Sequence, residues 1–340
     1  MNKKERFNQV LSGEASQYPL VSSWHHFLEA EYEAEALAEA TIQFAQEHDW
    51  DWIKINPRAV YLAEAFGNVY DPDDYRDVFP RQLQQRIQTP ADVWQVPIVE
   101  AATSAPLQEQ LQAVKQIRSA LPEMPLVQTL FSPLTILLFL TGNTSYVNQT
   151  MYGSNAPLDV KKLLETEGAG VHQALDHITE TMIDYLKELE KNGIDGVFYA
   201  VTGTANEELF AKEIFDEFSL PYDLRVLKAV TGKRLLHTCG EFSQPERFDD
   251  YPVDGISWDT YAKGNPDLSV PLKKVKIGGL DHQLFGQDKR ETIRQQTDQA
   301  LKQMEGVPFL LTPNCAVPVN VTPAELQDIK ENVERKREKR

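Results

Sequence analysis

The sequence predicts an α/β fold, a (β/α)8 barrel of the TIM type, from three observations. Short apolar runs of strand length alternate with amphipathic helical stretches along the 340 residues, a pattern typical of parallel sheets. The apolar runs number eight, the count of a (β/α)8 barrel, although a doubly wound sheet can also hold eight strands. Polar and aromatic side chains follow most of the runs, at the end of a barrel where active sites form. We expect one barrel domain over residues 1–340.

The predicted strands are short, apolar and spread along the whole chain. They cover residues 19–24, 51–56, 125–131, 194–201, 234–239, 254–258, 275–280 and 308–314. The long connection between the second and third strands, residues 57–124, is rich in glutamine with scattered prolines. Because structureless loops of that length are uncommon inside a domain, we expect extra helices there, inserted over the mouth of the barrel.

Two helices have clear boundary signals. Residues 159–192 carry apolar side chains three to four positions apart and end before Gly193, where a glycine cap is expected. Near the end of the chain, Thr322, Pro323 and Glu325 predict a capping box with proline in the first turn. The last helix should therefore begin soon after the eighth strand.

The composition favours a soluble protein of the cytoplasm. Hydrophobic residues make up 41% and charged residues 25% of the chain, as in typical globular proteins. The net charge of −17 argues against nucleic acid or an anionic membrane as the main partner. No apolar segment follows the charged start, and the longest apolar run, residues 134–140, is too short to span a bilayer. Two cysteines do not make a disulfide framework, so we expect a reducing compartment. The composition is also compatible with an oligomer.

Both cysteines lie where a zinc ion could use them. Cys239 follows His237 by two residues at the end of the fifth predicted strand, and Cys315 follows the eighth. Residues i and i+2 of a strand point to the same side, so His237 and Cys239 should project together. Catalytic zinc sites commonly have three protein ligands and an open fourth position, which one imidazole and two thiolates would provide. The alternative is that both cysteines are small buried hydrophobes beside a hydrogen-bonded core histidine.

Further residues at strand ends are candidate catalytic groups. Asp259 follows the sixth strand and could be a fourth zinc ligand, an acceptor behind the ligands, or only the cap of a loop. His25 and His26 follow the first strand; one should point into the barrel mouth and the other away, and either is a proton carrier or a packed histidine. Tyr199, on the fourth strand, is a candidate substrate contact. Other polar residues at strand ends are Lys54, Asn56, Arg58, Glu241 and His282.

The order of the elements and five motifs resemble the uroporphyrinogen decarboxylase superfamily over nearly the whole chain. The motifs are residues 4–14 (KERFNQVLSGE), 193–197 (GIDGV), 236–240 (LHTCG), 254–259 (DGISWD) and 278–281 (GGLD). The resemblance implies a (β/α)8 barrel, in agreement with the strand count.

Two chemistries compete within this superfamily. One branch decarboxylates uroporphyrinogen, in porphyrin and heme biosynthesis, without a metal. The other branch, the cobamide-dependent methyltransferases of the methylcobamide:coenzyme M type, carries a His-x-Cys pair and a distant cysteine as zinc ligands. His237, Cys239 and Cys315 match that second pattern. The resemblance to this branch implies zinc, a small thiol substrate bound as a zinc thiolate, and a corrinoid methyl donor on a partner protein.

The sequence departs from the decarboxylase branch after the first strand. Those enzymes have an Arg-Gln-Ala-Gly-Arg-Tyr segment there, whose arginines bind substrate carboxylates, whereas residues 22–27 here are SSWHHF. A porphyrinogen needs such cations because buried unpaired carboxylates are costly. We therefore expect a zinc-dependent methyltransferase. Uroporphyrinogen decarboxylase, and a barrel of the same family that has lost catalysis, are the alternatives.

Overall fold

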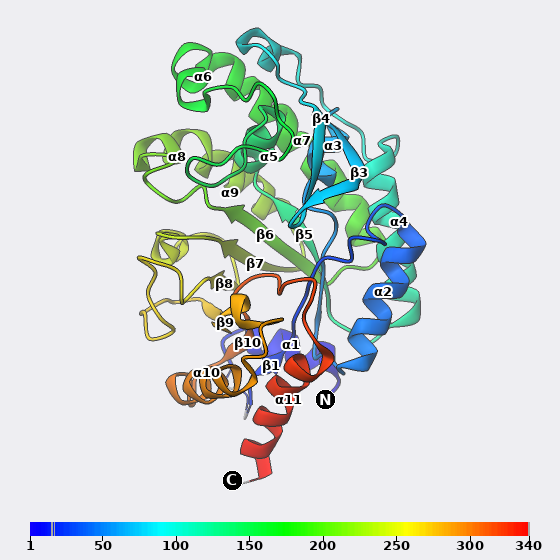
Figure 1. Cartoon of the computed structure of the whole chain (residues 1–340), viewed down its shortest axis with the longest axis vertical. Helices are drawn as coiled ribbons and strands as arrows, with labels where there is room; N and C mark the ends of the chain where they lie inside the picture. Colours follow the sequence, from blue (N-terminus) through cyan, green and yellow to red (C-terminus); the bar gives the residue numbers. More distant parts are fainter. Residues whose placement is uncertain (15, 17, 339–340) are drawn as a thin grey trace.

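A curled sheet of eight parallel strands forms the centre of the computed structural model, which describes residues 1–14, 16 and 18–338 (Figure 1). From edge to edge the strands are β1 (Leu20–Val21), β10 (Phe309–Pro313), β9 (Val275–Leu280), β8 (Gly255–Trp258), β7 (Lys233–Thr238), β6 (Gly196–Thr202), β5 (Leu126–Phe131) and β2 (Ile53–Ile55). Each coincides with a predicted strand. From β5 to β10 every strand pairs with the next one in the chain, which is the order found in a (β/α)8 barrel.

The two edge strands of this sheet lie next to each other. The backbone N–H of Asp51, just before β2, donates to the carbonyl of Val21 on β1 at 2.9 Å. The hydroxyl of Ser22 donates to the carbonyl of Trp52 at 2.7 Å. The predicted α/β fold is therefore confirmed, and the curled sheet is consistent with a TIM-like barrel.

Helices surround the sheet (Figure 1). They are α1 (Lys3–Leu11), α2 (Ala34–Glu47), α3 (Tyr61–Ala65), α4 (Ala105–Ala120), α5 (Pro133–Leu140), α6 (Val160–Thr166), α7 (Gly168–Lys191), α8 (Lys212–Phe218), α9 (Leu220–Ala229), α10 (Arg290–Gln303) and α11 (Pro323–Glu338), with short 3-10 turns η1 (Pro90–Gln95), η2 (Pro245–Phe248) and η3 (His282–Leu284). Within the described residues, no helix is both long and apolar enough to cross a membrane.

The hydrophobic core has an inner and an outer part. The inner part joins Phe7 of α1 to the buried side chains of Trp24, Trp52, Phe198 and Leu310, which come from four parts of the sheet. The outer part fills the space between the sheet and the helices. Because α1 packs into the inner core at one end of the strands, the opposite end is left for a site.

Both predicted helix signals are confirmed, with one difference. Asp159 accepts a hydrogen bond from the backbone of Lys162 at the start of α6, and Gly193 follows α7 with a left-handed φ of 94°. The predicted helix over 159–192 is divided at Glu167 into α6 and α7. Gly170 allows close packing after this break, because a Cβ there would lie 2.7 Å from the Trp94 ring. Thr322 and Glu325 form the predicted capping box of α11.

The segment between β2 and β5 differs from the prediction. It contains α3, η1 and α4, but also an antiparallel hairpin of β3 (Val69–Arg76) and β4 (Phe79–Gln84). Half of the β3 sequence, VYDPDDYR, is charged and it includes a proline, so it lacks the apolar alternation of a typical strand. Asp77 makes the turn with a left-handed φ of 55°.

Candidate metal centre

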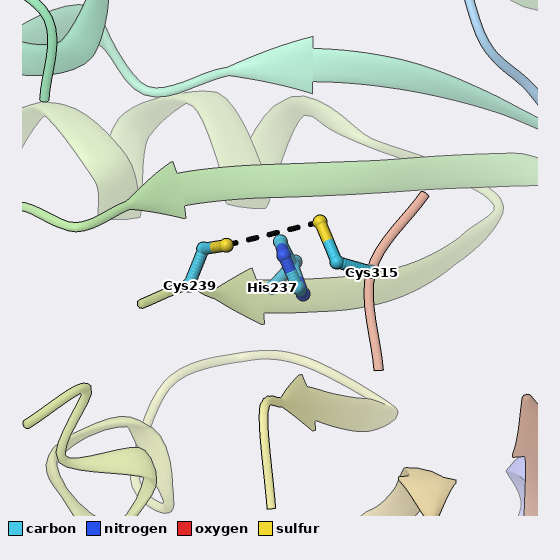
Figure 2. A group of neighbouring side chains, drawn as sticks. All are labelled: His237, Cys239 and Cys315. Atoms are coloured by element: carbon cyan, nitrogen blue, oxygen red, sulfur yellow. Dashed lines mark hydrogen bonds between the residues drawn. The ribbon is translucent and has the colours of Figure 1, made fainter. Parts of the chain in front are cut away.

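The three predicted metal ligands come together at the ends of the strands (Figure 2). His237 is on β7, Cys239 follows β7 directly, and Cys315 follows β10. One nitrogen of His237 and the sulfurs of Cys239 and Cys315 all lie within 4.8 Å of one another. In the part of the chain that the structure describes, no other group of three histidine, cysteine or acidic side chains is arranged in this way.

The geometry of the two sulfurs fits zinc. The Sγ atoms of Cys239 and Cys315 are 3.8 Å apart. Two thiolates at tetrahedral positions on zinc, with Zn–S bonds of about 2.3 Å, are separated by about 3.8 Å. The cysteines are therefore spaced as a zinc ion requires, and a disulfide would need them to move together.

A hydrogen bond fixes the imidazole of His237. Its Nδ1 lies 3.1 Å from the Ser257 hydroxyl on β8, the neighbouring strand. Nε2 is therefore the nitrogen left for a metal. A metal-binding histidine commonly uses its second nitrogen in such a contact, which sets the tautomer and the ring orientation.

Hydrogen bonds of the Asn314 side chain fix the loop that carries Cys315. Its amide donates to Asp259 Oδ1 at 3.1 Å and to the Thr260 hydroxyl at 3.0 Å, while its Oδ1 accepts from the backbone of Gly279 at 2.8 Å. A Cβ on Gly278 would lie 2.7 Å from this same oxygen. Glycine at this position lets Asn314 connect three strand ends and hold the neighbouring cysteine.

The two thiols have opposite pKa shifts. The pKa of Cys315 is well below its usual range, because Cys239 donates a hydrogen bond to it and His237 lies close. The pKa of Cys239 is raised by the same hydrogen bond and by burial. The hydrogen bond between the two sulfurs lets the pair share one proton.

A cavity of about 200 Å³ opens onto the three ligands. Its walls are mostly aromatic and apolar: Trp24, Phe198 and Phe131 come from the sheet and Phe79 from the hairpin. Its polar lining is formed by His26, Lys54, Asn56, Thr129, Ser145, Tyr146 and Thr202. The cavity has the size of a small ligand and gives it direct access to the position of a metal.

Lys54 is a buried cation in this cavity. Its Nζ donates to Asn56 and lies 5.2 Å from the centre of the Trp24 ring and 5.0 Å from that of Phe198. Burial lowers the pKa of Lys54 to about 7, and the nearby Cys315 acts in the opposite direction. Within the described residues it has no carboxylate partner, so its charge faces the thiols and the cavity.

The candidate catalytic residues lie in three different surroundings. Asp259 is buried behind the cysteines, where Asn314 holds Oδ1 and His282 Nδ1 lies 3.7 Å from Oδ2, and it is outside the three-ligand cluster. Tyr199 faces away from the cavity and donates to Asp223 on α9 at 2.6 Å. Glu241, one of the polar residues at strand ends, is exposed, and the contact of His237 Nδ1 is with Ser257.

The adjacent histidines point in different directions, as the sequence predicted. His25 packs between Phe27 and Phe44, with ring centres 4.3 Å and 4.9 Å away, and burial lowers its pKa to about 4. His26 lines the cavity and contacts Glu31. The structure therefore brings His26, and not His25, to the metal centre.

Two contacts of the centre had no signal in the sequence. Tyr146, in the loop after α5, lies beside Cys239, and burial and this thiol raise its pKa. Its ring packs over Gly203, where a Cβ would lie 2.7 Å from it. Phe79 reaches the cavity only through the unpredicted hairpin. Neither residue lies at the end of a predicted strand, and strand alternation could not have found them.

Known proteins resemble this chain in sequence. A family model described as Uroporphyrinogen decarboxylase (URO-D) matches residues 10–335. A uroporphyrinogen decarboxylase of Ruthia magnifica subsp. Calyptogena magnifica is 26% identical over 203 residues, which are 57% of this chain. The methylcobamide:CoM methyltransferase MtbA of Methanosarcina acetivorans is 24% identical over 207 residues, which are 59% of this chain. The chain spans 55% of the length of each of these two relatives.

Solved structures resemble it over a longer stretch. A methyltransferase from Methanosarcina mazei superimposes with a TM-score of 0.80 at 18% identity, covering 99% of both chains. A B12-independent methionine synthase from Shewanella sp. W3-18-1 gives a TM-score of 0.59 at 14% identity, covering 95% of this chain and 99% of the other. At such identities, these likenesses show a shared fold.

Proposed function

Because the chain belongs to the uroporphyrinogen decarboxylase family, whose relatives include a methylcobamide:CoM methyltransferase, we propose that it is a zinc-dependent methyltransferase. It would move a methyl group between a corrinoid and a small thiol. The thiol would enter the cavity at the metal centre, and the corrinoid would be carried by a partner protein.

The observation that carries this proposal is the geometry of the three ligands. His237 offers one ring nitrogen and the two cysteines offer sulfurs 3.8 Å apart, a donor set that fits zinc, and all three residues line the cavity. These residues would hold the ion beside a bound ligand. A histidine and two thiolates also differ from the histidine-rich sets that serve water-activating zinc enzymes.

The chain's own residues have separate tasks in this proposal. Bound zinc would supply the Lewis acidity that lowers the pKa of a thiol substrate. Ser257 keeps the His237 ring turned so that Nε2 stays available. Lys54 places a positive charge beside a ligand set that becomes anionic when a third sulfur joins it. The aromatic walls exclude water, which strengthens these interactions and keeps the bound sulfur nucleophilic.

The surroundings of Arg58 favour this function over porphyrinogen decarboxylation. Arg58 lies just after β2. Its Nε contacts Glu64 at 2.6 Å, its Nη1 contacts Glu109 at 2.5 Å, and its plane stacks on Tyr32 at 4.2 Å. With its charge already paired, Arg58 offers little to a substrate carboxylate. The residues that line the cavity include Lys54 but no arginine.

The direct test uses cobalt in place of zinc. We expect small thiols to increase the sulfur-to-cobalt charge-transfer absorption, as a third sulfur enters the open position. With methylcobalamin and the same thiols, the zinc form should yield a thioether. In His237→Ala this rate should fall by more than about 100-fold, beyond what the loss of an outer-sphere partner alone causes.

Thr238→Val is a matched control, because Thr238 lies between two ligands and its hydroxyl donates away from them, to the carbonyl of Ser243. This variant should keep the spectral response. If no thiol in a broad panel alters the cobalt spectrum, the site is closed and the methyltransferase proposal is wrong.

A further inference from the structure

We infer that His26 is a catalytic residue that accepts the proton of the thiol entering the metal centre, and that Glu31 holds it in position for this task. This inference rests on the proposed function and assigns a destination to the proton that the thiol must lose.

The first argument is the position of the imidazole. His26 lines the same cavity of about 200 Å³ as His237, Cys239 and Cys315, so a ligand that enters this cavity shares it with both the candidate metal ligands and the His26 ring. Nδ1 lies 3.2 Å from Glu31 Oε2. Nε2 is the remaining nitrogen, and within the described residues no protein group takes it.

The second argument is the support behind the ring. Glu31 is completely buried, and its other carboxylate oxygen accepts from the hydroxyl of Tyr75, on strand β3 of the hairpin, at 2.9 Å. The backbone carbonyl of Glu31 accepts from Arg58 Nη1 at 2.9 Å. A carboxylate held in this way keeps the proton of a neutral imidazole on Nδ1. That leaves the lone pair of Nε2 directed away from Glu31, as a general base requires.

The third argument is the contrast with the neighbouring histidine. His25 Nδ1 lies 3.1 Å from the backbone carbonyl of His26, and its ring packs among Phe27 and Phe44. His25 does not line the metal cavity. A packed histidine and a carboxylate-oriented histidine therefore stand side by side, and only His26 can meet a ligand there.

The charged groups around His26 are compatible with this role. Glu31 faces it from the loop before α2, with Tyr75 of β3 and Arg58 behind that carboxylate. Lys54 of β2 belongs to the same cavity and is the competing candidate for the proton.

The proposed step balances as follows. The S–H bond of the thiol breaks and an N–H bond forms at His26 Nε2, while the electron pair stays on sulfur. That pair forms the new carbon–sulfur bond to the methyl group. The methyl group leaves the corrinoid, which keeps the electron pair of the broken bond. His26 then returns the proton to solvent.

The test measures how fast a thiol enters the cobalt-substituted protein, by stopped-flow recording of the charge-transfer band. The probe is 2-mercaptoethanol. At about pH 7, where a thiol of pKa about 8.5 is mostly protonated, His26→Gln should slow entry by about 100-fold, the lower range of general-base effects. At about pH 9.5, where the thiolate dominates and no base is needed, the difference should disappear. Glu31→Gln should show a smaller loss with the same pH dependence.

Two comparisons complete the experiment. His172→Gln is the matched control, because His172 lies on α7 and is partly exposed, and it should behave like the wild type at both pH values. Lys54→Met tests the competing base. The inference is overturned if His26→Gln binds thiol as fast as wild type at about pH 7, if its deficit persists at about pH 9.5, or if Lys54→Met alone shows the pH-reversible loss. If wild type gives no spectral response with any thiol, the proposed function itself fails.

Discussion

At the scale of single residues, the candidate metal centre depends on two thiols that the sheet brings together from β7 and β10. Their sulfurs are 3.8 Å apart, and both lie within 4.8 Å of one nitrogen of His237. Removing any one of the three ligands leaves two, which is fewer than zinc sites in proteins use. The fold should survive such a change, because the inner hydrophobic core lies on the other side, around Phe7 and Trp52.

We therefore predict about one zinc per chain, and its loss in Cys239→Ala and in Cys315→Ala. Ser257→Ala should weaken zinc binding by 10-fold to 100-fold, as expected for the loss of a group that orients a ligand. Metal content of the purified proteins and circular dichroism check these outcomes. Stoichiometric metal in the variant lacking both cysteines would contradict the assignment.

Lys54 gives a second prediction at this scale. Its ammonium lies between Trp24 and Phe198, without a carboxylate partner in the described chain, and faces a ligand set that gains negative charge when a thiol binds. Lys54→Met should raise the Kd of the cobalt form for thiols by about 10-fold, which corresponds to about 1.4 kcal/mol. Lys276→Met is the control, because Lys276 is a partly buried lysine that does not line the cavity, and its Nζ donates to the carbonyl of Leu268. If Lys54→Met and Lys276→Met bind thiols with equal affinity, Lys54 does not contribute to thiol binding.

At the scale of elements, the alternation of side chains along β6 explains one outcome of the sequence analysis. Phe198 and Ala200 line the cavity, and Ala200 is paired with His237 on β7. Tyr199 lies between them and must point to the other face, towards α9. Tyr199 lies in the middle of β6 and not at its end as predicted, and the two-residue period assigns it to the helix-facing side.

The contact between β6 and α9 also predicts a pH dependence of stability. Asp223 is completely buried and accepts hydrogen bonds from Tyr199 at 2.6 Å and Ser219 at 2.8 Å. Burial raises its pKa from 3.8 to about 7. The folded state thus holds the proton more tightly than the unfolded state. The stability that this group contributes is fully present below about pH 4 and is lost as the pH rises to about 7.

Asp223→Asn cannot ionise and should lose this pH dependence. Relative to wild type, it should gain stability between pH 5 and pH 8 by an amount on the order of a few kcal/mol. Urea unfolding at both pH values measures the difference, with the exposed Asp250→Asn as the control. If the free energy of unfolding changes with pH in the same way in wild type and in Asp223→Asn, ionisation of Asp223 does not destabilise the folded state.

At the scale of the whole molecule, local signals predicted most of the fold and the ligand set. The eight strands, the α11 capping box and the His237-x-Cys239 pair each depend on a few neighbouring residues. The remaining features depend on contacts between distant segments. The sequence of the β3–β4 hairpin is polar, and its position follows from packing at the cavity, where Phe79 lines the wall. The choice of His26 over His25 depends on Glu31 and Tyr75, which meet only in the folded chain.

The same distinction applies to Arg58, and it leads to the last prediction. In the sequence Arg58 is a free cation near a strand end, whereas in the structure Glu64 and Glu109 pair with it. The cavity of about 200 Å³ is lined by Lys54 but by no arginine. Burying the carboxylates of a porphyrinogen there would leave most of them unpaired, at a cost of several kcal/mol each.

We therefore expect no release of carbon dioxide when the purified protein is given uroporphyrinogen, and no protection of the protein by this compound against thermal unfolding. A uroporphyrinogen decarboxylase assayed in parallel verifies the substrate. Turnover on the order of 1 per second or faster would mean that the cavity opens far beyond the observed volume and that Arg58 leaves its two carboxylates. In that case Arg58→Ala should abolish the reaction. If turnover is absent while thiols bind the cobalt form, the result favours thiol chemistry at the candidate metal centre over porphyrinogen decarboxylation.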